Sequence, residues 1–66
     1  MPITEVENDV YAMVRHYNYL GRYIEAQNIE HYFKQKYTKQ EVGYALQLLK
    51  KEHRIGFTRK RGWLIK

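Results

Sequence analysis

The chain has no cysteine, no serine and a single proline, Pro2, among its 66 residues. The lack of cysteine excludes disulfides and thiolate metal sites, and it suits a reducing compartment. The lack of serine removes a common hydroxyl nucleophile, and the one aspartate, Asp9, falls near the start of an expected helix. Because no internal proline or low-complexity segment marks a linker, we expect one domain over residues 1–66.

Long apolar stretches are also missing. No run approaches the ~20 residues that a helix needs to span a bilayer, and no signal-peptide core follows Met1. His16, His31 and His53 lie far apart and lack the spacing of metal ligands. We therefore expect a cytoplasmic protein, associated with the nucleoid if its source is prokaryotic. It should have no membrane contact, no metal, no cofactor and no enzymatic activity.

Charge is distributed unevenly along the chain, whose net charge is +5. Residues 1–33 hold two cations and five anions, a net charge of −3, whereas residues 34–66 hold ten cations and two anions, a net charge of +8. This separation of negative and positive charge indicates an anionic partner for the second half of the chain. The alternative is an ordinary solvated surface.

Helical spacing dominates the first third of the chain. Thr4 and Glu7 have the spacing of a capping box, in which each side chain bonds the backbone N–H of the other residue. Gly21 can adopt the left-handed conformation that ends a helix. We expect a first helix over residues 5–18 and a short extended segment over residues 22–24. The apolar face of this helix carries Val6, Val10, Met13, Val14 and Tyr17.

Two more helices are expected in the middle of the chain. Thr38 and Glu41 form a second capping box, which begins a helix over residues 38–51. The connection before it is so short that the two helices must cross at a steep angle. The earlier helix, of roughly ten residues, carries Ile29, Tyr32 and Phe33 on one face. The later helix is expected to bury Val42, Ala45, Leu46 and Leu49.

Beyond His53 the spacing becomes that of strands. Apolar residues alternate with small or polar ones in residues 55–58, and β-forming residues return in residues 63–65. Gly62 can take the positive φ of a turn, so we expect a hairpin whose tip is residues 59–62. Trp63 should face the core unless a bulge near Gly62 reverses the strand. The expected fold class is α+β, mainly α, in the order helix, strand, helix, helix, strand, strand.

Three segments in this order, "RYIEAQNIEHYF", "TKQEVGYALQLLKKEHRIGF" and "TRKRGW", make the chain resemble the winged helix-turn-helix family. The resemblance covers nearly the whole chain and implies a three-helix bundle with a C-terminal β-hairpin wing. It also implies that helix 38–51 lies in the DNA major groove and that the tip 59–62 touches the backbone or the minor groove. Some members of the family bind proteins through the same surface, so the fold does not decide the function.

The outward face of helix 38–51 agrees with this reading, because it is polar and free of carboxylates. Glutamine can bind adenine through two hydrogen bonds, lysine can donate to guanine, and tyrosine can contact a thymine methyl group. Gly43 costs about 1 kcal/mol relative to alanine inside a helix, which either DNA or a neighbouring helix approaching closely would explain. The residues expected on this face are Lys39, Gln40, Gly43, Tyr44, Gln47 and Lys50.

The three adjacent cations Arg59, Lys60 and Arg61 repel one another, and a polyanion would relieve that repulsion by counterion release. The alternative is a solubilising turn that protects the hairpin from pairing with other chains. Thr38 and Arg54 also have structural roles open to them, as an N-cap and as a charge near a helix C-terminus. The candidate DNA-binding residues are Lys36, Thr38, Lys39, Gln40, Gly43, Tyr44, Gln47, Lys50, Arg54, Arg59, Lys60 and Arg61.

The sequence therefore predicts sequence-specific or architectural binding of double-stranded DNA by a small transcriptional regulator, either as a monomer or as a homodimer on paired half-sites. A second hypothesis is a module that docks onto proteins of a replication or transcription assembly, and a third is binding of double-stranded RNA. The seven tyrosines are more typical of core or interface packing than of base stacking. Tyr11, Tyr19 and Tyr23 are candidates for a dimer surface.

Overall fold

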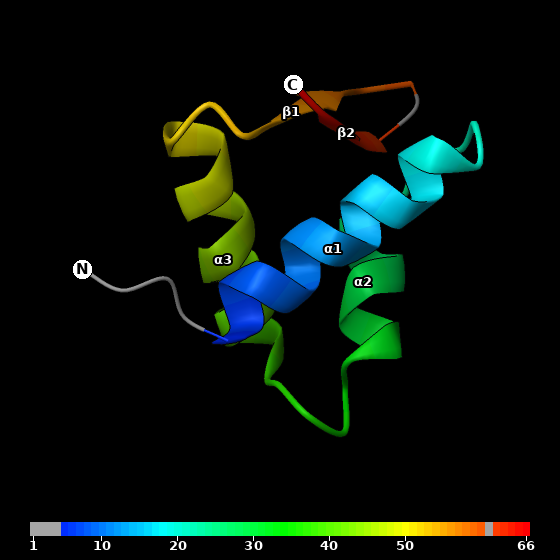
Figure 1. Ribbon diagram of the computed structural model, residues 1–66. Coiled ribbons are helices and arrows are strands. Elements are labelled where there is room, and N and C mark those ends of the chain that lie inside the picture. Colours follow the sequence, from blue (N-terminus) through cyan, green and yellow to red (C-terminus); the bar gives the residue numbers. More distant parts are fainter. Residues whose placement is uncertain (1–4, 61) are drawn as a thin grey trace.

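Three helices precede a β-hairpin in the computed structural model, which describes residues 5–60 and 62–66 (Figure 1). The hairpin, orange to red in Figure 1, crosses the C-terminal end of the first helix. The predicted fold class, a mainly helical α+β domain, is confirmed at this level. The molecule measures 27 × 25 × 19 Å along its principal axes. Its elements are α1 (Glu5–Tyr19), α2 (Ala26–Tyr32), α3 (Lys39–Lys51), β1 (Ile55–Thr58) and β2 (Gly62–Ile65).

The core lies where α1, α3 and the hairpin meet, and α2 closes it by packing on α3. The helical spacing read from the sequence is confirmed in α3, and in α1 both Val10 and Val14 are fully buried. Tyr32, which we expected on a buried face, is instead 67% exposed, whereas Ile29 and Phe33, expected on the same face, are buried. The buried face of this short helix is therefore narrower than the sequence spacing indicated. The buried apolar residues are Val10, Val14, Ile24, Ile29, Phe33, Val42, Ala45, Leu46, Leu49, Ile55 and Trp63.

Local signals set the observed ends of the helices. The second capping box is present: the Glu41 N–H donates to Thr38 Oγ1 at 3.1 Å, and the Thr38 N–H donates to Glu41 Oε1 at 2.9 Å. Gly21 follows α1 with a φ of +77°, as expected for a helix stop. The first predicted capping box involves Thr4, which lies outside the described residues.

The hairpin pairs β1 and β2 antiparallel, with Phe57 opposite Trp63 and Thr58 opposite Gly62. Gly62 has a φ of +106°, and Trp63 is buried without any reversal of β2. Phe57 shares the hairpin face of the fully buried Ile55 but is 50% exposed. The physical reason is that the Trp63 ring fills the core side, so Phe57 packs on that ring, 4.9 Å away between centroids, and leaves its other side to solvent.

The expected extended segment at 22–24 is reduced to one β-bridge, between Ile24 and Trp63. The Trp63 N–H donates to the Ile24 carbonyl at 2.9 Å. The side chain of Asn18 continues this edge, because its Oδ1 accepts from the Ile65 N–H at 2.8 Å and its Nδ2 lies 3.4 Å from the Trp63 carbonyl. The outer edge of β2 is therefore occupied although the described sheet has two strands only.

Candidate nucleic-acid interface

The polar face predicted for α3 is directed to solvent. Gln40, Tyr44 and Gln47 are exposed, and Tyr44 keeps 59% of its surface accessible. Lys39 and Lys50, near the two ends of the helix, are exposed as well. The opposite face, which packs into the core, fixes this orientation. A row of cations, amides and one phenol about 18 Å long is thus presented outward, given the rise of 1.5 Å per helical residue.

Gly43 lies between these residues on α3, where a Cβ atom would have nothing within 4 Å. Within the part of the chain that the structure describes, no neighbouring helix therefore approaches Gly43 closely. The free space at this position belongs to the surface, where another molecule can come close to the backbone of α3.

The hairpin tip and the start of α3 line the same groove, which has a volume of about 460 Å³. Arg59 comes from the tip, Lys39 from the first turn of α3, and Phe57 from β1. Arg59 and Lys60 are exposed, whereas Arg61 lies outside the described residues. The remaining wall comes from Gly62 and from Glu25, Ala26, Gln27 and Glu30 at the start of α2.

A second depression continues this surface along the α2–α3 junction. Gln27, Glu30 and Lys39 line both hollows, so the two are contiguous. Sequence reasoning missed the part played by α2, which contributes none of the predicted DNA-binding residues but lines both hollows. Glu25 and Glu30 place two carboxylates beside Lys39 and Arg59, so the groove carries both signs of charge. The sequence indicated only weakly that Glu25 and Glu30 line a groove, because single glutamates at or near a short helix are usually exposed to solvent.

Lys36 differs from the other candidate residues, because α1 carboxylates compensate its charge. Its Nζ lies 3.0 Å from Asp9 Oδ2 and 3.3 Å from Glu5 Oε1, and these bonds raise the pKa of Lys36. The Tyr37 hydroxyl donates to the same Asp9 oxygen at 2.6 Å. This hydrogen bond lowers the pKa of Asp9 below its ordinary value of 3.8, and the hydrogen bond from Lys36 makes the second largest contribution. We therefore leave Lys36 out of the interface that we propose.

This cluster makes the stability of the domain depend on pH. Because the pKa of Asp9 is lower in the folded chain, its ionised form stabilises the fold above about pH 4, and this contribution is lost as the pH falls further. Tyr37→Phe should lower the thermal midpoint near pH 7 and raise the pKa of Asp9, and the difference from the wild type should be smaller near pH 2. Thermal melts at both pH values test this. Tyr44→Phe is the control, and an equal Tyr37→Phe loss at both pH values would contradict the role of ionised Asp9.

Arg54 is also engaged within the fold. Its guanidinium lies over the ring of Tyr11, 4.3 Å from the centroid, so it connects the end of α3 to α1. Arg54 does not line the groove of Lys39 and Arg59. Thr38 is the N-cap of α3, which is the structural role that the sequence left open for it.

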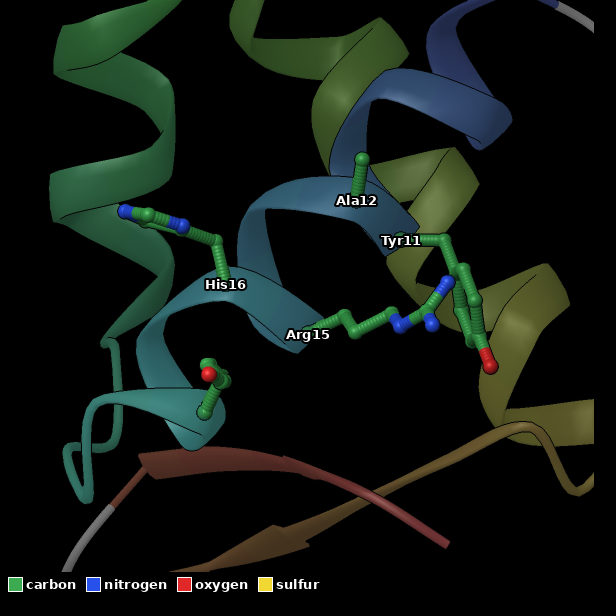
Figure 2. Close-up of a pocket in the computed structure, with 5 residues that line it drawn as sticks. Tyr11, Ala12, Arg15 and His16 are labelled. Carbon is green, nitrogen blue, oxygen red and sulfur yellow. The ribbon is translucent and has the colours of Figure 1, made fainter.

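A different surface lies on the outer side of α1 (Figure 2). Tyr11, Ala12, Arg15, His16 and Tyr19 line a shallow pocket of about 400 Å³. Figure 2 shows Tyr11 and Arg15 directed to one side of the helix and His16 to the other, towards α2. Tyr19, 80% exposed, is followed in the chain by Leu20, 58% exposed. This surface includes two of the tyrosines that we considered for a dimer interface.

Two kinds of site are missing from the part of the chain that the structure describes. Residues 5–60 and 62–66 contain no cluster of three or more histidine, aspartate or glutamate side chains that could hold a metal ion. None of the helices in these ranges combines the length and the apolar character required to cross a bilayer.

The chain was also compared with protein-family models, with curated proteins and with solved structures. No family model, no curated protein and no solved structure matches it.

Proposed function

We propose that this protein binds double-stranded DNA as a winged-helix domain and acts as a small transcriptional regulator. One observation carries the proposal: Lys39 at the start of α3 and Arg59 at the hairpin tip line one groove. The second half of the chain, with its net charge of +8, supplies both residues. A helix and a basic turn that face the same side can contact adjacent parts of one polyanion.

The layout of the fold supports the winged-helix assignment. Three helices are followed by a hairpin, and Ile24 bridges β2 at the place where this family has its first strand. In this arrangement α3 enters the major groove, and the hairpin is the wing that lies on the backbone or in the minor groove. The exposed side chains of Gln40, Tyr44 and Gln47 then face base edges, and Lys39, Lys50 and the wing cations face phosphates.

A salt titration with duplex DNA of random sequence tests this function directly. About five phosphate contacts predict a slope of log K against log salt of roughly −4 to −5. The double variant Arg59→Ala/Lys60→Ala should weaken all duplexes alike, by about tenfold near 0.1 M salt, and reduce the slope by about 2. Fluorescence anisotropy on a labelled duplex gives both quantities.

Lys36→Ala is the control, because it removes a cation whose charge Asp9 and Glu5 already compensate. Its salt slope should equal that of the wild type. An absence of duplex binding at about 50 mM salt would exclude the proposed function, and an unchanged slope in the double variant would remove the hairpin from it. Stronger competition by duplex RNA of the same length would favour the RNA hypothesis.

A second candidate function is protein binding, which the exposed aromatic residues favour. Tyr19, Leu20 and Tyr23 follow one another around the α1–α2 connection with 80%, 58% and 37% of their surfaces exposed. Aromatic and large apolar side chains on a surface are typical of interfaces with proteins. Under this hypothesis the salt titration detects no duplex binding, and substitutions at the hairpin leave the interaction intact.

A further inference from the structure

Phe57 is an aromatic residue that lines the groove instead of being buried in the core. Half of its surface is exposed, and it lines the groove together with Lys39 and Arg59. Its ring makes a tilted contact with the buried ring of Trp63, with centroids 4.9 Å apart and an angle of 55° between the ring planes. The backbone N–H of Trp63 is hydrogen-bonded to the Ile24 carbonyl. Phe57 is therefore a half-exposed aromatic ring whose position is set by its contact with the core.

The other walls of the groove complement a nucleobase more closely than a bare phosphate. Gln27 Nε2 donates one hydrogen to Glu25 Oε2 at 3.1 Å, which leaves its second N–H as a donor and its carbonyl oxygen as an acceptor. Glu30 offers a further acceptor, so the groove holds both kinds of group that the Watson–Crick edge of an unpaired base requires. A phosphate deep in this groove would meet the carboxylates of Glu25 and Glu30. Phosphates are favoured at the rim instead, where Lys39 and Arg59 lie.

We propose that the groove formed by the start of α2, the start of α3 and the hairpin binds one unpaired base of a DNA strand, stacked on Phe57, at the end of a duplex that α3 holds. The inference rests on the proposed function and specifies its substrate as a junction between double-stranded and single-stranded DNA. A nucleobase fits any aromatic face, so the stacking gives affinity for an unpaired end without strong sequence preference. In a continuous duplex every base is paired, so none is free to enter the groove.

Binding of a blunt duplex and of the same duplex with a short single-stranded overhang tests the proposal. Stacking of a base on an aromatic side chain changes affinity by about 5- to 150-fold, so the overhang should bind at least about fivefold more tightly. Phe57→Leu, which keeps apolar bulk but removes the ring, should bring the two affinities within about twofold. Phe57→Tyr should retain the preference. Overhangs of both polarities are included, because the groove does not fix the strand direction.

The single tryptophan supplies an independent readout. Because Trp63 lies against Phe57, a stacked base should change its emission with the overhang and not with the blunt duplex. Tyr32→Leu is the matched control, since Tyr32 is an exposed aromatic residue outside this groove, and it should keep the overhang preference. Melting curves confirm that each variant is folded.

The outcomes separate this inference from the function on which it rests. Equal affinities for blunt and overhang DNA, or a preference that survives Phe57→Leu, would overturn the inference and leave duplex binding intact. Binding to single strands that depends on Phe57, with no binding to blunt duplexes, would support the stacking surface and exclude the proposed duplex function.

Discussion

Replacing Gly62 with alanine should lower the free energy of unfolding by about 2–4 kcal/mol, because two costs add. The φ of +106° is one that residues with a Cβ rarely adopt. The new Cβ would also lie 2.6 Å from the carbonyl oxygen of Ile24, a backbone atom that the Trp63 N–H holds in place. A domain of this size has a total stability of only about 3–10 kcal/mol, so the loss would be a large fraction of it.

Two other glycines are matched controls for this prediction, measured by urea or thermal unfolding. Gly21 also has a positive φ, but a Cβ there meets nothing within 4 Å, so Gly21→Ala should cost only the strain, about 1 kcal/mol. Gly43 is helical and equally open, so Gly43→Ala should stabilise the domain by up to about 1 kcal/mol. If Gly62→Ala cost no more than Gly21→Ala, the close approach of Ile24 would have no energetic importance.

Asn18→Leu should destabilise the domain by about 2–3 kcal/mol, because it leaves backbone groups of two segments without their partner. The Asn18 amide joins the Ile65 N–H, the Trp63 carbonyl and, at 3.0 Å, the Arg22 carbonyl. Leucine has similar bulk but cannot replace these bonds. Equilibrium unfolding measures the loss, and amide hydrogen exchange at Ile65 should become faster.

Two further variants show whether the loss in Asn18→Leu comes from the missing hydrogen bonds. Asn18→Asp keeps the acceptor for Ile65 and loses the donors, so its loss should be smaller than that of the leucine variant. Asn28→Leu is the control, because Asn28 is an exposed asparagine on α2, and it should change stability by less than about 0.5 kcal/mol. If the leucine variants at the two positions behaved alike, the Asn18 amide would not hold the edge of β2.

The helices could be predicted from the sequence because their signals are local. The spacing of Val10 and Val14 marks the buried face of α1, and Thr38 with Glu41 marks the start of α3. The predicted burial of Tyr32 was wrong, although Ile29 and Phe33, assigned to the same face, are buried. In a helix of seven residues the spacing does not determine how wide the buried face is, because that depends on the elements that pack against it.

The candidate site was predictable only where one helix carries it. The exposed face of α3 follows from its buried face, so the exposure of Gln40, Tyr44 and Gln47 could be predicted in advance. The groove depends on how distant segments meet, and no local pattern brings Glu30 next to Lys39 or places Phe57 beside Arg59. The same holds for Asn18, whose partners are 45 and 47 residues away in the chain.

The small dimensions of the molecule limit how much sequence information a single copy can read. At about 3.4 Å per base pair, the longest axis of 27 Å covers about eight base pairs, less than one full turn of B-DNA. In the proposed complex a monomer of that reach would contact one side of the double helix and distinguish only a handful of base pairs, a pattern that recurs throughout any genome. The proposed regulator would therefore gain its selectivity from cooperation between neighbouring copies, or from a structural feature of DNA that is rarer than a short sequence.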